Sequence, residues 1–276
     1  MKNWFITGVS SGFGQALVHE LLAQGHRVAG TLRTEAQCAE FAKLAPGATI
    51  PVLLDVTDHA AIPAAVAEVE KTLGPIDVFV NNAGYGYEGP LEETRLEDVR
   101  KQFEVNTFGA FSMMQAVLPY LRSRRRGHIL NVTSMGGLTV FPGVGVYNAS
   151  KFALEGLNAA LAKEVTQFGI KVTAIEPGGF RTDWAGRSML RGERSIGDYD
   201  ASFEPQRAAR AERSGRQIGD PKKAAKAMIK ITEVDNPPVH LLLGSDALSA
   251  VRAALAELNR EIDTWESLTL TTDVSE

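Results

Sequence analysis

Short, continuously apolar segments alternate along the chain with longer segments of helical periodicity. The apolar segments are strand candidates, at residues 4–7, 27–32, 49–54, 76–80, 128–132, 170–175 and 239–243. The segments with helical periodicity lie between and after them, at residues 15–24, 58–73, 96–121, 147–168, 221–232 and 248–262. Strands that are apolar throughout are typical of strands buried on both faces of a sheet. The alternation therefore predicts an α/β protein with a doubly wound, parallel sheet of seven strands and helices on both faces.

The length of 276 residues fits one domain, 1–276, with two additions to the repeating pattern. Residues 184–220 are rich in charge and follow the sixth strand, at the edge where such sheets bind ligands. Two interpretations are open, a solvated surface excursion or a substrate lid, and the position favours a lid. Its arginines are interspersed with Glu and Asp, so anion recognition is not implied. Residues 245–276 form a C-terminal extension.

Composition excludes several classes of protein. The single cysteine, Cys38, leaves no disulfide framework and no cysteine-rich zinc site, and five scattered histidines predict no metal centre. A net charge of −4 gives no general attraction to nucleic acid. The chain shows no apolar run long enough for a membrane span and no signal-peptide pattern, which predicts a cytoplasmic protein.

A glycine-rich turn follows the first strand, with the sequence TGVSSGFG from Thr7 to Gly14. Glycines at such a turn allow a tight bend, close approach of a pyrophosphate and close packing of the next helix. The N-terminus of that helix offers free N–H groups to phosphate. An ordinary tight turn is the alternative. The predicted cofactor contacts here are Gly8, Ser10, Ser11, Gly12, Phe13 and Gly14.

The end of the second strand predicts which dinucleotide is bound. An acidic residue there would accept a hydrogen bond from the 2′-hydroxyl of NAD, but the strand ends on Leu32 and Arg33. A guanidinium can bind a 2′-phosphate through two hydrogen bonds. The sequence therefore predicts NADP(H) rather than NAD(H), with a solvated surface arginine as the alternative.

Tyr147 and Lys151 are four residues apart, at a spacing that places both on one helix face. A nearby ammonium, together with an oxidised nicotinamide ring, would lower the pKa of a tyrosine and make it a general acid or base. Tyr-x-x-x-Lys is common on helices, so position matters: the pair opens the helix after the fifth strand. Ser134 lies just past that strand, where its hydroxyl could orient a substrate oxygen.

Together, the TGxxxGxG turn, the Asn81-Asn82-Ala83-Gly84 segment, Ser134 and the Tyr147/Lys151 pair resemble the short-chain dehydrogenase/reductase family over residues 3–183, and the rest matches in length and strand order. The resemblance implies a Rossmann-type fold and a catalytic tetrad of Asn106, Ser134, Tyr147 and Lys151, in which Asn106 holds a water that links Lys151 to solvent. It also implies further cofactor contacts, at Asp55, Val56, Asn82, Ala83, Gly84, Tyr147, Lys151, Pro177, Gly178, Phe180 and Thr182. Phe180 departs from the pattern, because a smaller aliphatic residue is more usual there.

The function predicted from these features is an NADP(H)-dependent oxidoreductase that reduces a ketone or aldehyde, or oxidises the alcohol, with Tyr147 as general acid/base. A catalytically silent NADP-sensing or scaffold protein is the alternative. Trp184, Met189, Leu190 and Trp265 could line an apolar pocket for a bulky carbonyl or alcohol substrate. The family resemblance implies a homodimer or homotetramer built on the helices at 96–121 and 147–168, without a nucleic-acid partner.

Overall fold

The structure is a computed structural model that describes residues 1–274, apart from the side chain of Ala185. Its main sheet has seven parallel strands in the order β3-β2-β1-β4-β6-β7-β9. Their bounds are β1 Asn3–Ile6, β2 Arg27–Leu32, β3 Thr49–Leu53, β4 Val78–Asn81, β6 Gly127–Val132, β7 Ile170–Pro177 and β9 His240–Leu243. The predicted doubly wound, seven-stranded sheet is thus confirmed.

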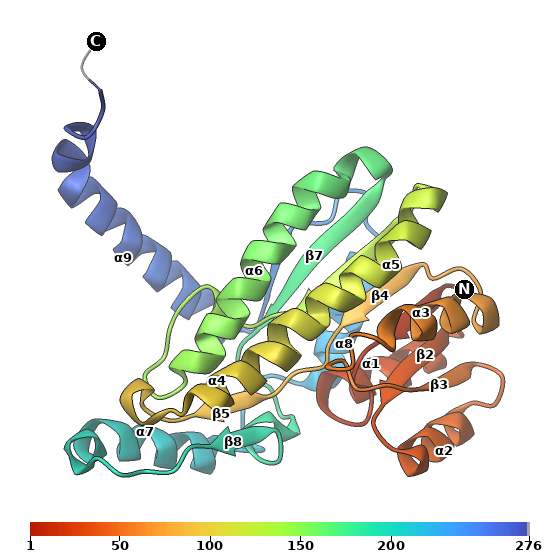
Figure 1. The fold of residues 1–276 in the computed structure, drawn as a ribbon, viewed down its shortest axis with the longest axis horizontal. Coiled ribbons are helices and arrows are strands. Elements are labelled where there is room, and N and C mark those ends of the chain that lie inside the picture. The colour runs from red at the N-terminus through yellow and green to blue at the C-terminus, as the bar shows by residue number, and fades with distance from the viewer. Residues whose placement is uncertain (275–276) are drawn as a thin grey trace.

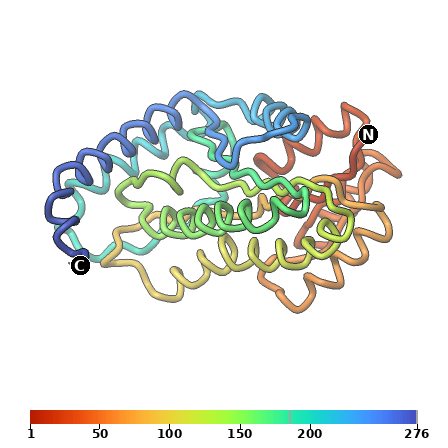
Figure 2. Tube along the Cα trace, turned by 90° about the horizontal axis from the view of Figure 1, so that it is seen from above, coloured from red at the N-terminus to blue at the C-terminus, as the bar shows by residue number. Residues whose placement is uncertain are grey.

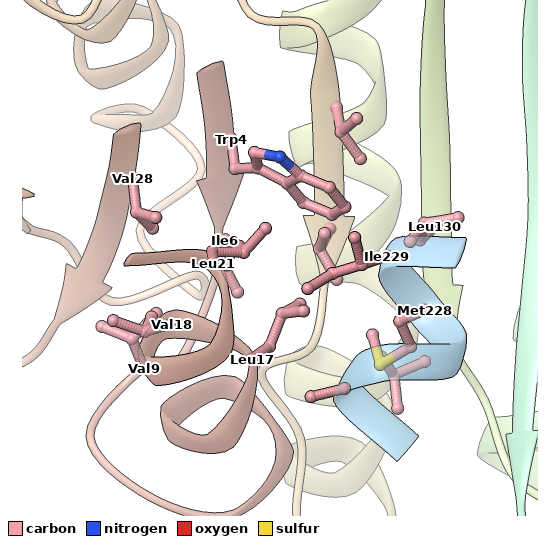
Figure 3. Packing of buried hydrophobic residues seen from close by; sticks show 14 of the residues in the cluster. Trp4, Ile6, Val9, Leu17, Val18, Leu21, Val28, Leu130, Met228 and Ile229 are labelled. Atoms are coloured by element: carbon pink, nitrogen blue, oxygen red, sulfur yellow. The ribbon is translucent and has the colours of Figure 1, made fainter. Parts of the chain in front are cut away.

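Helices cover both faces of this sheet (Figure 1). On one face lie α1 (Gly12–Ala23), α2 (Glu35–Leu44) and α8 (Pro221–Ile231). On the other lie α3 (Ile62–Thr72), α5 (Ala110–Arg124) and α6 (Gly145–Val165). Figure 3 shows the first core, where Leu17 and Leu21 of α1 and Met228 of α8 meet strand residues such as Trp4. Fully buried strands explain why the chain shows apolar runs instead of alternation.

Strand order places the glycine-rich turn at the switch point of the sheet. The chain builds outward from β1 through β2 to β3, then returns and builds in the other direction from β4. Ligands of doubly wound sheets bind at the carboxyl ends of the strands beside such a reversal. The turn after β1 and the segment after β4 therefore meet at the position where a dinucleotide site is expected.

The predicted helix at 96–121 is divided into three parts. α4 (Leu96–Phe103) leads into a π-helical segment, η2 (Glu104–Gly109), which continues as α5. Gly109 has no room for a side chain, because a Cβ there would lie 2.9 Å from Val56. The widened turn carries Asn106, and such turns occur frequently at functional sites.

Several boundaries differ from the sequence prediction. α3 begins at Ile62 instead of residue 58, because Asp58 bonds the amide of Ala61 within the preceding turn. α2 was not predicted, since half of its apolar residues are alanines that give a weak periodicity. The last helix, α9 (Ser245–Leu270), extends beyond the predicted 248–262 at both ends and stands away from the sheet (Figures 1 and 2).

Residues 184–220 hold regular structure. Their elements are the end of η5 (Asp183–Ala185), β8 (Met189–Arg191), η6 (Gly197–Tyr199) and α7 (Asp200–Arg213). β8 pairs in parallel with β5 (Gly86–Glu88), which follows β4. This small sheet attaches the segment to the carboxyl end of the main sheet. Within the described residues, no helix is both long and apolar enough to cross a membrane.

Candidate active site

The glycine-rich turn forms an open cradle at the start of α1. Gly8 has φ +70°, a backbone conformation that side chains rarely allow. A Cβ on Gly14 would lie 2.3 Å from the carbonyl oxygen of Gly8, so only glycine fits there. Ser11 precedes α1 but its side chain makes no capping hydrogen bond, which leaves the first amides of the helix available. Such a helix N-terminus favours an anion.

The segment after β4 holds this turn in place. Asn82 donates from Nδ2 to the carbonyl oxygens of Thr7 (2.9 Å) and Gly8 (2.8 Å). The Thr7 hydroxyl accepts hydrogen bonds from the amides of Asn82 and Ala83. A Cβ on Gly8 would lie 3.0 Å from Cα of Ala83. The two predicted cofactor segments are therefore in direct contact.

Arg33 and Asp55 lie at the ends of β2 and β3. Arg33 is exposed, and its amide bonds the side chain of Gln37. Asp55 is also exposed and accepts hydrogen bonds from the amide and hydroxyl of Thr57. The side chain of Val56, the next residue, is buried against Gly109 of η2. The residue that follows β2 is thus an arginine instead of an Asp or Glu, and its positive charge suits a phosphate.

Tyr147 lies near the start of α6, facing Ser134 at the end of β6. Its side chain is buried, and Trp184 lies against it with ring centroids 5.0 Å apart. Burial raises the pKa of Tyr147 to about 12, and a hydrogen bond with Ser134 offsets only part of this effect. Desolvation thus dominates in the protein alone, and the lowering of this pKa by Lys151 together with an oxidised nicotinamide ring stays a prediction.

Lys151 is buried behind Tyr147. Its Nζ donates to the carbonyl oxygen of Val132 (2.9 Å) and lies 5.8 Å from the centre of the Tyr147 ring. Burial lowers the pKa of Lys151 to about 8, although the carboxylate of Glu155 acts in the opposite direction. Because burial removes most of the water around the Lys151 ammonium, this group gains from contact with any polar group that enters the site.

Asn106 closes the inner side of this group. Nδ2 of its side chain donates to the carbonyl oxygen of Tyr85 (3.0 Å) and to the hydroxyl of Ser150 (3.1 Å). Its Oδ1 accepts a hydrogen bond from the backbone amide of Tyr85 (3.1 Å). A Cβ on Gly84 would lie 3.1 Å from Oδ1 of Asn106 and 3.5 Å from Nζ of Lys151. The structure thus brings the four predicted tetrad residues together around the ends of β4 and β6.

The segment after β7 has a mixed outcome. Thr182 faces the glycine-rich turn, because a Cβ on Gly12 would lie 3.8 Å from its Cβ. The amide of Gly178, which follows Pro177, instead bonds the carbonyl of Leu243 in β9. The side chain of Phe180 is buried, and its ring packs on Phe13 with centroids 5.1 Å apart. Its size thus serves packing beneath the turn.

Two polar groups escaped the sequence analysis. The amides of Asn81, Asn131 and Asn158 form a buried chain of hydrogen bonds (2.8 and 2.9 Å) that ties β4 to β6 and α6. Polar residues inside apolar runs were the available signal for it. Glu155, Glu176 and His240 also meet: a carboxylate oxygen of each glutamate and a ring nitrogen of the histidine lie within 4.8 Å of one another, close enough to hold a metal ion. The histidines are therefore not all isolated, but nothing in the sequence joins α6, β7 and β9 at this point.

The arginines of the 184–220 segment pair mainly with carboxylates. Glu88, almost fully buried, receives Arg210 (2.6 Å), Arg191 (3.2 Å) and Arg207 (3.8 Å). Arg194 contacts Glu93 (2.6 Å) and also Asp200 and Glu204. The pKa of Glu93 is lowered to about 2, because its carboxylate accepts hydrogen bonds from the amides of Ser195 and Ile196 and from the Arg194 guanidinium. These contacts fasten the segment to β5 and the turn after it.

Trp184 lies beside Tyr147 and meets Met189 at Gly86, but two other predicted pocket residues lie elsewhere. A Cβ on Gly86 would lie 2.9 Å from both Trp184 and Met189. Leu190 points outward, with 49% of its surface exposed. Trp265 is 61% exposed near the end of α9, so its predicted place in the pocket is wrong.

Comparison with known proteins agrees with this arrangement. Residues 2–190 match the model of the short chain dehydrogenase family, and the chain belongs to that family. It is 39% identical to a 3-ketodihydrosphingosine reductase of Bacteroides thetaiotaomicron, covering 87% of this chain and 86% of the relative.

Solved structures give the same result. A short-chain dehydrogenase from Streptomyces avermitilis superposes with a TM-score of 0.92 at 36% identity, covering 99% of this chain and all of the other. ElxO with NADP bound gives a TM-score of 0.74 at 27% identity, covering 90% and 99%. The chain is therefore an enzyme of the dehydrogenase/reductase class, whose family includes proteins that bind a nicotinamide cofactor.

Proposed function

We propose that this oxidoreductase uses NADP(H) to interconvert a ketone or aldehyde and the corresponding alcohol. The observation that carries the proposal is the grouping of Tyr147, Ser134, Lys151 and Asn106 at the carboxyl end of β6, beside the glycine cradle. A buried phenol and a neighbouring hydroxyl are suited to bind one carbonyl oxygen and transfer one proton.

The cradle fits a dinucleotide by its shape and its donors. Gly12 leaves open space on one side of the turn, Gly8 and Gly14 let the turn pack closely on its neighbours, and the free amides at the start of α1 suit a pyrophosphate. Asp55 and residues 82–84 would hold the adenosine end, and Thr182 would hold the nicotinamide end. When bound, the nicotinamide group supplies or accepts a hydride at the carbonyl carbon.

Each tetrad residue then has a separate task. Tyr147 is protonated at neutral pH, because its pKa is about 12, and is thus loaded as an acid for carbonyl reduction. Ser134 orients the substrate oxygen beside that phenol. Lys151 provides a positive charge that favours the phenolate left after proton transfer, and Asn106 anchors a proton path between Lys151 and solvent.

The preference for NADP(H) rests on Arg33. It is exposed and directly follows β2, where it can turn toward a 2′-phosphate, and it stands at the position where an NAD-selecting Asp or Glu would lie. The NADP-bound neighbour is consistent with this choice.

The substrate enters between Tyr147 and the 184–220 segment, which acts as a lid. Trp184 lies on Tyr147, and Met189 lies close to Trp184 at Gly86, so a substrate must displace an aromatic, apolar surface. We therefore propose a bulky apolar carbonyl compound. The relative from Bacteroides thetaiotaomicron acts, by its name, on a keto compound.

The remaining proposals concern the whole molecule. We propose a single domain over residues 1–276 in a cytoplasmic enzyme, since Cys38 is an unpaired thiol. An oligomer built on η2, α5 and α6 is supported by the exposed rings of Phe108, Phe111 and Phe152, which such an interface would cover.

The central experiment follows NADPH oxidation with a panel of ketones and aldehydes, using Tyr147→Phe and, as a control, Tyr120→Phe at a half-buried position on α5. We expect turnover of at least one carbonyl compound, a loss of roughly 100-fold or more in kcat for Tyr147→Phe, and unchanged turnover for Tyr120→Phe. Turnover that survives in Tyr147→Phe would refute the assigned acid. NADPH binding without turnover of any carbonyl would instead support the silent, cofactor-sensing alternative.

Cofactor choice is tested separately with Arg33→Ala and the neighbouring surface control Lys43→Ala. We expect Arg33→Ala to lower the ratio of NADPH to NADH affinity by about tenfold or more, which corresponds to one charge-assisted interaction of about 1.4 kcal/mol. An unchanged ratio would remove Arg33 from the site.

A further inference from the structure

Most of α9 has no packing partner in the protein. Ala247 and Val251 are buried near its start, where it contacts β9 and the short helix η3 (Met135–Gly137). From residue 255 to residue 270 every residue is exposed, and Figure 1 shows this part of the helix standing away from the rest of the chain. An isolated helix of such length is only marginally stable in water, so a partner that covers it would explain why the sequence retains it.

The exposed part carries a regular apolar stripe. Leu255, Leu258, Ile262 and Trp265 are between 50% and 61% exposed. Their spacing of three, four and three residues places all four on one side, in the pattern of a two-stranded helical pair. Scattered surface apolar residues would need no explanation, but four in coiled-coil register form a continuous docking face.

We propose that α9 is an assembly helix, which pairs in antiparallel orientation with α9 of a second copy of this chain. With the twofold axis beside residue 260, Leu255 lies opposite Trp265 of the second copy, and Leu258 lies opposite Ile262. The interface is then self-complementary, as a twofold dimer requires.

The sequence on either side of the stripe fits this register. Thr269 of the second copy, near the end of α9, falls opposite Val251. Val251 is already covered by the body of its own chain, so a small polar residue suffices there. The large apolar residues face each other only along the bare part of the helix.

Charge favours the antiparallel orientation over the parallel one. A parallel pair would place Glu261 beside Glu266 of the other copy along both edges. The antiparallel pair retains one like-charge contact, between the two copies of Glu261, and brings Arg252 next to Glu266 of the other copy. It also places Leu268, itself 58% exposed, against the small Ala254.

A membrane surface is the less suitable occupant. α9 carries five acidic residues and two basic ones. Helices that lie in a membrane interface are instead rich in Lys and Arg on the polar face, which anionic lipids attract.

Sedimentation velocity of the full chain tests the pairing. We expect the double variant Leu258→Glu/Ile262→Glu to sediment at half the mass of the wild type, whether the wild type is a dimer or a larger assembly. Both side chains are exposed in the monomer, so circular dichroism should report an intact fold. Leu44→Glu, at a comparably exposed apolar position on α2, should keep the wild-type mass. A wild-type monomer, or a double variant of unchanged mass, overturns the proposal.

Single-cysteine variants test the orientation. Leu258→Cys and Ile262→Cys should form few interchain disulfides alone, and should cross-link when the two are mixed and oxidised. Each variant cross-linking alone would show parallel helices and overturn the antiparallel pair. The wild type, whose Cys38 is buried, is the control. Loss of binding to anionic phospholipid vesicles in the double variant, without a change in mass, would assign α9 to a membrane instead and likewise overturn the proposal.

Discussion

Replacing Glu88 by Gln should loosen the 184–220 segment without disturbing the cofactor cradle. The Glu88 side chain is 2% exposed and contacts three arginines, of which Arg191 belongs to β8 and Arg207 and Arg210 belong to α7. Glutamine has nearly the same shape but carries no charge. The substitution therefore removes the electrostatic attraction and leaves three partly buried guanidinium groups around a neutral amide.

The size of the effect follows from burial. Removing one partner of a fully buried ion pair costs about 3–5 kcal/mol. The arginine side chains here are 23–36% exposed, so water recovers part of the loss. The amide can still accept one hydrogen bond. We therefore expect the segment to be destabilised by about 2 kcal/mol, which raises its open population about 30-fold.

Limited proteolysis measures this population directly. Phe203 of α7 is buried, so chymotrypsin can cleave after it only when the segment opens. When opening and closing are fast, the cleavage rate follows the open population. We expect Glu88→Gln to be cleaved there about 30-fold faster, with a higher KM for the carbonyl substrate and an unchanged Kd for NADPH.

Glu92→Gln is the matched control. Glu92 is exposed and accepts a hydrogen bond from the hydroxyl of Tyr199 in the same segment, at 2.6 Å. Its replacement should cost only about 0.5–1 kcal/mol. If Glu88→Gln and Glu92→Gln are cleaved at the same rate, the buried carboxylate does not fasten the segment and the reasoning fails.

Three further predictions concern the site and the core. Ser134→Ala should lower kcat by about 100-fold while Thr133→Val lowers it far less, since only Ser134 faces the phenol; equal losses would contradict the assignment. Gly14→Ala should weaken NADPH binding by at least about tenfold, because its Cβ would clash with a carbonyl oxygen. Gly156→Ala, which has open space around it, should leave NADPH binding unchanged and stabilise α6 by about 0.5–1 kcal/mol. Isothermal titration measures the binding, and urea unfolding measures the stability. Burial lowers the pKa of His128 to about 3, so its neutral form stabilises the fold above pH 6.5, and that stability is lost as the pH falls from 6.5 toward 3. His128→Leu should therefore reduce the slope of the unfolding free energy against pH in this range, by up to about 1.4 kcal/mol per pH unit. An unchanged slope would show that His128 does not titrate on unfolding.

The sheet could be predicted because its strands are buried on both faces. A continuous apolar run is a direct consequence of that burial, so every strand of the main sheet was located to within a few residues. The segment at 184–220 gave no such signal. Its order comes from ion pairs such as Arg194–Glu93, between residues about a hundred positions apart, and no local pattern reports them.

The candidate site shows the same division. Local motifs located the turn at Gly8–Gly14 and the Tyr147/Lys151 pair, because phosphate binding and helical spacing each impose a short-range pattern. The upward shift of the Tyr147 pKa in the protein alone could not be predicted, since it depends on burial beneath Trp184. Spacing along a helix records which side chains share a face, but it does not record how much water reaches them.

The pairing of charges in the 184–220 segment also bears on substrate choice. Because Arg207 and Arg210 contact Glu88, and Arg194 contacts Glu93, these cations already have carboxylate partners before any substrate enters. An anionic substrate would have to break those contacts to gain new ones, at little net advantage. Trp184 on Tyr147 loses no such partner when it moves aside, so contact with an apolar substrate can replace what its displacement exposes. Selectivity of the proposed reductase is therefore expected to follow the shape and apolar area of the carbonyl compound rather than its charge.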